Sequence, residues 1–226
     1  MNRSFRFLLF VWVALAAGAP AAPAQTANPH RFESEIAAFE AADKANPPPK
    51  NAILFVGSSS IRKWTSVADD FPSHKVINRG FGGSHLSDVD YYFDRIVLPY
   101  KPKMIVLYAG SNDINAGKTP ETVVDDYKAF VQKVGSALPD TKVAFISINT
   151  SPARWNEVEK VKQANRQIAD FIAKNGKLIF IDTFSAVLDG EGKPRPELYV
   201  QDRLHMNAKG YAIWTAIIAP YLGPPE

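Results

Sequence analysis

Five short apolar runs recur along the chain, and longer stretches with helical periodicity separate them. The runs, which we expect to be strands, lie at 52–56, 76–78, 103–109, 142–148 and 177–181. Because they are apolar throughout rather than alternating, both faces of the sheet must be covered. Strands that alternate with helices form parallel sheets with right-handed crossovers. The pattern therefore predicts an α/β fold, a three-layer α/β/α sandwich with a five-stranded parallel sheet of the flavodoxin-like type.

Helical periodicity occurs in four stretches: 30–45, 119–138, 156–174 and about 208–222. The first places Phe32, Ile36 and Phe39 on one face and ends at the run NPPPK. We therefore divide the chain into an N-terminal helix with a proline-rich linker at 25–50 and a main domain at 51–226.

The first 24 residues have the composition of a secretory signal peptide. Two arginines precede an apolar core of about 11 residues, and small residues lead to a cleavage site after Ala24. An uncleaved membrane anchor is the alternative, but the core is shorter than the ~20 residues that span a bilayer. The sequence thus predicts an exported protein, periplasmic or secreted, with no stable membrane insertion after cleavage.

Charge and cysteine content exclude several classes of function. Cleavage removes Arg3 and Arg6 and leaves 24 basic against 23 acidic residues, with no basic stripe, so nucleic acid is not an expected partner. There are no cysteines, which rules out disulfides, thiolate metal sites and cysteine nucleophiles. Three of the four histidines, His30, His74 and His85, lack metal-ligand spacing. We therefore expect neither a metal nor an organic cofactor.

Polar and glycine-rich segments follow each predicted strand. They are GSSS at 57–60, RGFGGSH at 79–85, GSNDI at 110–114, NTSPARW at 149–155 and, just before the last helix, DRLHMN at 202–207. Ligands of such sheets bind outside the carboxyl ends of the strands. We therefore expect a serine, a glycine turn, an asparagine and an Asp/His pair to lie together at one edge of the sheet.

The Asp/His pair fits the needs of a serine nucleophile. His205 can accept a proton from a serine hydroxyl only if its ring has the correct tautomer and orientation, and a carboxylate on the other ring nitrogen supplies both. Three residues of separation let Asp202 reach that nitrogen. The alternative is that Asp202 only caps a turn and that His205 is a surface residue, because so short a pattern is weak evidence alone.

Asn112 and the glycine turn also allow two interpretations. Asn112 could hold a turn, since asparagine tolerates left-handed backbone, or its amide could donate to an oxyanion. The segment GFGGS can direct backbone N–H groups inward. It is not a dinucleotide-binding motif, because His85 stands where the third glycine should be, and the hydrolase motif G-x-S-x-G is absent because Ile61 replaces its second glycine.

Taken in order, these segments resemble the SGNH (GDSL-like) hydrolase family, especially its platelet-activating-factor acetylhydrolase-like branch. The resemblance extends from about Ala52 to Leu222. It implies that Ser59 is the nucleophile, that Asp202 and His205 complete a catalytic triad, and that Ser59, Gly83 and Asn112 form the oxyanion hole. Ser58 departs from the family pattern, which has aspartate there, and Ser84 stands where aspartate is common.

The resulting prediction is an exported serine esterase that hydrolyses a carboxylic ester through an acyl-enzyme intermediate. The expected partner is a small-molecule or glycan ester: a short acyl ester, a lysophospholipid or an acetylated glycan. A non-catalytic module that binds a glycan or an acyl group on the same fold is the alternative, because fold does not determine function. Four large side chains are candidates for the entrance of the site: Trp64, Arg79, Arg154 and Trp155.

Overall fold

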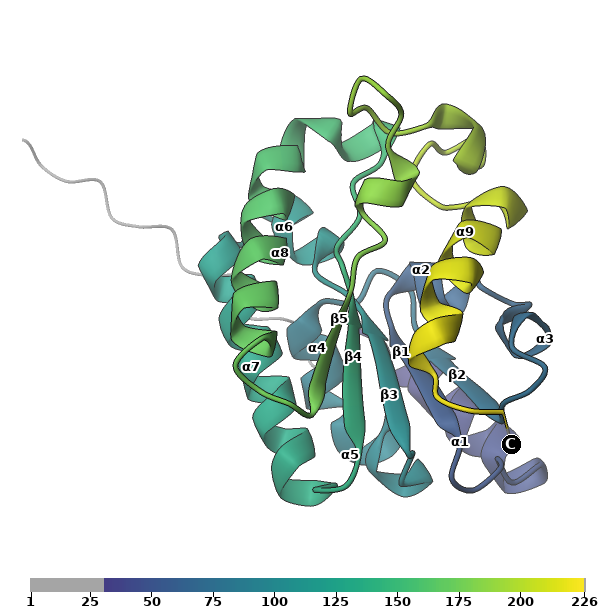
Figure 1. Cartoon of the computed structure of the whole chain (residues 1–226). Coiled ribbons are helices and arrows are strands. Elements are labelled where there is room, and N and C mark those ends of the chain that lie inside the picture. The colour runs from purple at the N-terminus through teal and green to yellow at the C-terminus, as the bar shows by residue number, and fades with distance from the viewer. Residues whose placement is uncertain (1–30, 226) are drawn as a thin grey trace, which may run out of the picture.

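Five parallel strands form the central sheet in the order β2-β1-β3-β4-β5 (Figure 1). Their bounds in this computed structural model, which describes residues 31–225, are β1 (Ile53–Gly57), β2 (Val76–Gly80), β3 (Met104–Tyr108), β4 (Lys142–Ile146) and β5 (Leu178–Ile181). Every neighbouring pair is parallel. The five predicted strands are therefore confirmed, and their order is that of flavodoxin-like sheets.

Nine α-helices belong to the described part of the chain. They are α1 (Glu33–Ala45), α2 (Ser59–Arg62), α3 (Val67–Asp70), α4 (Leu86–Tyr91), α5 (Phe93–Ile96), α6 (Ser111–Asn115), α7 (Pro120–Ala137), α8 (Val158–Ile172) and α9 (Ala208–Ile218). The four predicted helices correspond to α1, α7, α8 and α9. The shorter helices α2 to α6 were not predicted as separate elements.

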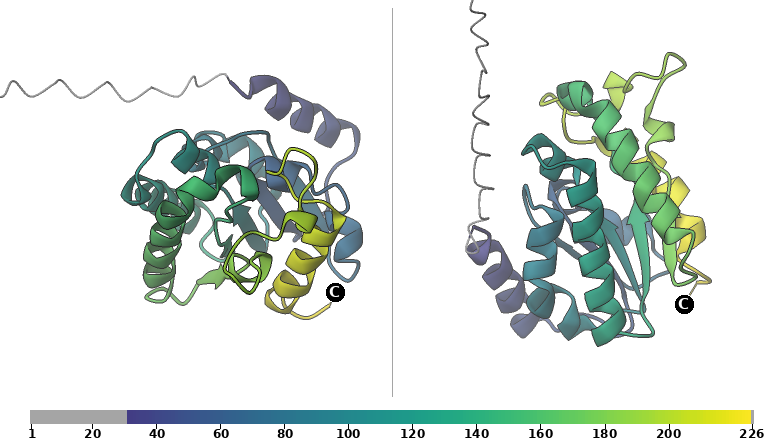
Figure 2. Two further views of the ribbon diagram at one scale, coloured as in Figure 1. Left: turned by 90° about the horizontal axis from the view of Figure 1, so that it is seen from above. Right: turned by 90° about the vertical axis from the view of Figure 1, so that its left-hand side faces the viewer.

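Helices cover both faces of the sheet, as the apolar strands require (Figure 2). On one face, alternate residues of β1 such as Leu54 and Val56 pack in a core with α1, α4, α5, α7 and α8. On the other face, Ile53 and Phe55 pack in a second core with α2, α3 and α9. This is the three-layer α/β/α arrangement.

Helix α1 packs onto the first of these cores. Ile36 is fully buried there, and Phe32 packs edge-on against Phe81, with ring centroids 4.9 Å apart. The N-terminal helix is therefore attached to the domain by an apolar face.

The chain reverses the direction of its crossovers between β1 and β3. The connection after β1 leads to β2 on one side, and the connection after β3 leads to β4 on the other. This arrangement opens a crevice at the carboxyl ends of β1 and β3, which is where flavodoxin-like folds bind ligands. Helices α2 and α6, which follow these two strands, lie above the strands in Figure 1.

The predicted signal peptide at 1–24 lies outside the described residues. Within residues 31–225, none of the helices combines the length and the apolar character needed to cross a membrane.

Candidate active site

Ser59 is the first residue of helix α2, directly after strand β1. The turn that presents it depends on Gly57, whose φ is +135° and where an added Cβ would lie 1.9 Å from the carbonyl oxygen of Tyr108. Only glycine allows this close approach of β1 to β3. The backbone N–H of Ser59 belongs to the first turn of α2, where N–H groups have no intrahelical acceptor. It is therefore available to a ligand.

The three consecutive serines have different environments. Ser59 Oγ lies 2.9 Å from Nε2 of His205, although the two residues are 146 positions apart in the sequence. Ser58 precedes the helix and is only 3% exposed. Ser60 lies in the helical turn, where its carbonyl oxygen accepts a hydrogen bond from Tyr211. Ser59 is thus the serine that the fold brings to the histidine.

Asp202 forms the turn before α9 and also orients His205. Its Oδ1 accepts hydrogen bonds from the backbone N–H groups of Leu204 and His205, both at 2.9 Å. Its Oδ2 lies 2.6 Å from Nδ1 of the His205 ring. The two interpretations of D-x-x-H are therefore compatible, because one oxygen caps the turn while the other holds the imidazole.

The hydrogen bonds to Asp202 also set its ionisation. Burial acts to raise the pKa of this carboxyl, but the donors of His205 and Leu204 outweigh it and hold the pKa well below its usual value. The carboxylate is therefore charged near neutral pH. It favours the His205 tautomer with a proton on Nδ1, which leaves Nε2 free to accept the proton of Ser59.

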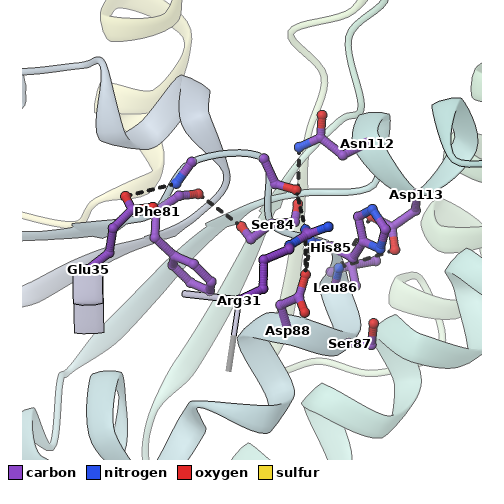
Figure 3. A network of polar contacts seen from close by, with 12 residues as sticks. Arg31, Glu35, Phe81, Ser84, His85, Leu86, Ser87, Asp88, Asn112 and Asp113 are labelled. Atoms are coloured by element: carbon purple, nitrogen blue, oxygen red, sulfur yellow. Dashed lines mark hydrogen bonds and ion pairs between the residues drawn. The ribbon is translucent and has the colours of Figure 1, made fainter. Parts of the chain in front are cut away.

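Asn112 lies in α6 and its side-chain amide has a defined orientation. Oδ1 accepts a hydrogen bond from Arg154 at 3.0 Å, and Nδ2 donates to the carbonyl oxygen of Ser84 at 3.1 Å (Figure 3). Because guanidinium only donates, Arg154 determines which end of the amide is oxygen. One N–H of Nδ2 remains for a ligand.

Gly83 lies in the turn between β2 and α4, with φ +73°. It is adjacent to Ser84, whose carbonyl oxygen is bonded to Asn112. Gly83 is not among the described residues that line the pocket at Ser59, whereas Asn112 and His205 are. The structure thus brings Ser59, His205, Asp202 and Asn112 together, and it places Gly83 in the loop that Asn112 contacts.

The pocket at Ser59 is small and polar. Its cavity volume is about 20 Å³, little more than one water molecule requires. Residues from four loops line it: Ser58, Ser59, Ser60, Tyr108, Ser111, Asn112, Asn149, Thr150, Ser151, Arg154, Tyr199, Leu204, His205 and Met206. Burial raises the pKa of the Tyr108 phenol, which therefore remains protonated. The pocket itself therefore has room only for a small group beside Ser59.

Two buried donors of this pocket lack a partner among the described residues, Asn149 Nδ2 and Ser151 Oγ. Hydrogen bonds through the hydroxyl groups of Ser147 and Thr183 determine the orientation of the Asn149 amide. Ser147 Oγ accepts the N–H groups of Thr183 and Phe184, so its own proton is directed to Thr183 Oγ1. Thr183 in turn donates to Asn149 Oδ1. The Asn149 amide therefore has its oxygen on Thr183, and its NH₂ group is available to a ligand.

Three of the four residues predicted at the entrance are not among the described residues that line the pocket. Trp64 is fully buried in the second core beside Trp214, and Arg79 pairs with Asp43 of α1. Proximity to a strand end does not determine which way a side chain points, and both of these point away from the crevice. Arg154 does line the pocket, whereas Trp155 is not among the described lining residues and stacks under Lys193.

Sequence reasoning also missed polar residues that support the site. Asp113 is fully buried, accepts hydrogen bonds from the N–H of Leu86 and pairs with Lys118 at 2.8 Å. It follows Asn112 directly, so the available sequence signal was an acidic residue next to a candidate site residue in the segment GSNDI. No group of three or more His, Cys, Asp or Glu residues within 31–225 has the arrangement of a metal site.

The fold and the site together define a serine hydrolase: a flavodoxin-like sheet whose first strand leads to a serine hydrogen-bonded to a histidine. Residues 52–213 match the GDSL-like lipase/acylhydrolase family. The chain belongs to this family, and it is an SGNH-type serine hydrolase with acylhydrolase or esterase activity.

Known proteins of this kind are similar over most of their length. Human platelet-activating factor acetylhydrolase IB subunit alpha1 is 26% identical over 179 residues, which cover 75% of this chain and 74% of the human protein. A GDSL-like lipase from Bacteroides thetaiotaomicron VPI-5482 aligns with a TM-score of 0.69 and 22% identity, over 86% of this chain and 96% of its own. A variant of an acetyl-xylooligosaccharide esterase from Geobacillus Stearmophilus aligns with a TM-score of 0.63 and 14% identity, over 77% of this chain and 95% of its own. The two structural likenesses show a shared fold.

Proposed function

We propose that this protein is an exported serine esterase in which Ser59 is the nucleophile, His205 the general base and Asp202 the residue that orients it. The observation that carries the proposal is the continuous chain from Ser59 Oγ through His205 to Asp202, with distances of 2.9 and 2.6 Å. A hydroxyl becomes a nucleophile when a positioned base takes its proton, and these distances meet that requirement.

The reaction proceeds in two halves. Ser59 Oγ attacks the acyl carbonyl while His205 Nε2 takes the hydroxyl proton, and the imidazolium then protonates the departing alcohol. The C–O bond to that alcohol breaks and an acyl-enzyme remains on Ser59. Water attacks this ester with His205 again as base, which releases the acid and restores the serine.

The oxyanion is stabilised by the N–H groups of Ser59 and Gly83 and by the amide of Asn112. Arg154 supports the assignment of Asn112, because its charge on Oδ1 polarises the amide and strengthens the remaining Nδ2 donor. Donors that are fixed before the reaction need no reorganisation when charge develops on the acyl oxygen.

The small polar pocket favours a short acyl group on an oxygen-rich alcohol, and we propose an acetylated glycan. The free donors Asn149 Nδ2 and Ser151 Oγ suit sugar hydroxyl oxygens better than an alkyl chain. The human and the Geobacillus relatives both have names that refer to acetyl esters. Ser58 leaves the contact between Ser59 and His205 intact, so its departure from the family pattern does not favour a purely binding function.

The test is hydrolysis by the purified protein, beginning with 4-nitrophenyl esters of increasing acyl length. We expect kcat/KM to be highest for the acetate and to fall for the butyrate and the octanoate. Acetylated oligosaccharides should then release acetate faster than a lysophospholipid releases fatty acid. A preference for the octanoate or for the lysophospholipid would contradict the proposed substrate, and absence of hydrolysis with all of them would contradict the proposed activity.

A further inference from the structure

The loop that carries Gly83 contains two consecutive glycines and needs external support to keep one conformation. We define the glycine loop as residues 80–85. Gly82 and Gly83 have no side chains to restrict them, and φ of Gly83 is +73°. The Gly83 N–H itself takes part in no hydrogen bond among the described residues, so its direction depends on the peptide groups on either side.

Helix α1 and the residues just before it bind both of these flanking peptide groups (Figure 3). Glu35 Oε2 accepts the N–H of Gly82 at 3.2 Å. Arg31 donates to the carbonyl oxygen of Gly83 at 2.8 Å. The peptide group between these two contacts is the one that carries the Gly83 N–H. Two side chains from the N-terminal segment thus fix the peptide groups on either side of it and thereby its orientation.

Each of the two side chains is itself held in place. Glu35 Oε2 also accepts a hydrogen bond from Arg62 at 3.1 Å, and Arg31 also pairs with Asp88 at 3.2 Å. Asp88 in turn accepts the N–H of His85 at 2.8 Å, which fixes the far end of the glycine loop. The contacts therefore form a connected network, in which the side chains of Arg31 and Arg62 are 45% and 47% exposed.

The helix is a firm support because it is anchored independently of the loop. Ile36 is fully buried in the core, and Arg95 of α5 forms hydrogen bonds with Glu40 at 2.6 and 2.7 Å. Among the described residues, neither Arg95 nor Glu40 forms a hydrogen bond with the glycine loop. Loss of a contact to the loop should therefore leave α1 in place.

We propose that Arg31 and Glu35 are positioning residues that direct the Gly83 N–H into the oxyanion hole. The proposal rests on the proposed function, since it concerns a donor to the transition state. Oxyanion donors act at 2.7–3.1 Å, and a displacement of about 1 Å can cost 10²-fold in rate. A segment that precedes the first strand of the sheet thus contributes to the chemistry at its carboxyl edge.

The test uses diethyl 4-nitrophenyl phosphate, which reacts once with each enzyme molecule and so does not require the natural substrate. Ser59 Oγ attacks phosphorus, 4-nitrophenolate leaves and His205 takes the serine proton, so nitrophenolate release reports the rate. We expect Glu35→Ala and Arg31→Ala each to react about tenfold more slowly, because the Gly83 N–H is misaligned in these variants but still present. With 4-nitrophenyl acetate, kcat should fall by a similar factor and KM should change less than twofold.

Two further variants separate positioning from stability. Glu35→Gln retains an oxygen that accepts the Gly82 N–H, so it should recover most of the rate that Glu35→Ala loses. Glu40→Ala is the matched control, because it removes a contact of the same helix with Arg95 but none with the glycine loop. It should lower the melting temperature at least as much as Glu35→Ala and leave the rate unchanged.

The outcomes distinguish this proposal from the proposed function. If the unaltered protein reacts but Glu35→Ala and Arg31→Ala react equally fast, the positioning role is wrong and the esterase remains. The role is also wrong if Glu40→Ala is slowed as much as they are, or if Glu35→Gln is as slow as Glu35→Ala. If the unaltered protein releases no nitrophenolate, the proposed function itself fails.

Discussion

Arg154 and Asn112 form a pair in which one side chain sets the orientation of the other. Arg154 donates to both Ser111 Oγ and Asn112 Oδ1, at 2.9 and 3.0 Å. It forms no salt bridge among the described residues, although its charge also acts on Glu157, where it opposes the rise in pKa that burial causes. At the scale of single residues, the proposed oxyanion donor Asn112 therefore depends on a group that does not touch the reacting carbonyl.

This dependence can be measured with a double-mutant cycle. Asn112→Ala should lower kcat by about 10²–10³ and change KM only a few-fold, because the amide acts mainly in the transition state. Arg154→Met should lower kcat less, by about tenfold, since it frees the amide without removing it. The double variant should be no slower than Asn112→Ala, because contacts that act through one group are not additive.

A different pattern would assign Asn112 to the turn alone. In that case Asn112→Ala would have a lower melting temperature, a raised KM and a nearly normal kcat. Measurement of kcat, KM and thermal stability for the three variants therefore decides between the two roles.

At the scale of elements, the turn before α9 combines structure and chemistry in one side chain. Antiparallel pairing of Tyr199 with Met206 closes the turn, and Asn207 caps α9 through the N–H groups of Lys209 and Gly210. Asp202 lies between them and uses one oxygen for the turn and one for His205. Asparagine, which keeps one acceptor oxygen and replaces the other by NH₂, can separate these two functions.

Asp202→Asn should keep the turn and lose the activity. Its amide oxygen can still accept the N–H groups of Leu204 and His205, but its NH₂ group cannot accept the Nδ1 proton. The ring then adopts the wrong tautomer, and kcat should fall by about 10⁴ with little change in melting temperature. Asp202→Ala should lose as much activity and also about 1 kcal/mol of stability, because the turn loses its cap. Full activity of Asp202→Asn would contradict the role of Asp202.

The pH dependence of stability has a defined sign at this residue. The pKa of Asp202 in the folded protein is lower than its usual value, so its contribution is present at pH values above the unfolded pKa. It is lost as the pH falls through the folded pKa. Because 42% of the side chain is exposed, solvent screens this contribution and it remains small.

Continuous apolar runs and long periodic helices could be predicted from the sequence, whereas short helices could not. The five strands are apolar runs, and helices α1, α7, α8 and α9 are long enough for their periodicity to be identified. Helices α2 to α6 span four to six residues each, too few for a periodicity to be recognised. The burial of Trp64 was missed for a related reason, since its partners Phe55 and Trp214 come from distant elements.

At the scale of the whole molecule, the site is assembled by sheet topology. Parallel strands bring every strand-end segment to one edge, so the sequence alone indicated that Ser59, Asn112 and His205 would meet. It could not indicate the hydrogen bonds between loops, such as those from Arg154 to Asn112 or from Arg31 to Gly83. Those contacts depend on side-chain directions that are determined only when the loops pack.

Export is a prediction at this same scale. If residues 1–24 are a cleaved signal, the mature protein should begin at Gln25 and be recovered from the periplasm or the medium. N-terminal sequencing of the protein from each fraction measures this directly. Recovery of a membrane-bound protein that retains Met1 would show that the segment is an uncleaved anchor.

The central claim is that Ser59 is the activated serine, and the most direct test is to identify the residue labelled by a fluorophosphonate probe. An activated serine forms a covalent adduct with the probe, whereas a serine without a positioned base does not. Peptide mass spectrometry of the labelled protein should find the adduct on Ser59. Ser59→Ala should remain unlabelled and lose about 10⁴–10⁶ in kcat, while Ser58→Ala and Ser60→Ala should still be labelled. An adduct on Ser58 or Ser60, or no adduct on the unaltered protein, would contradict the account.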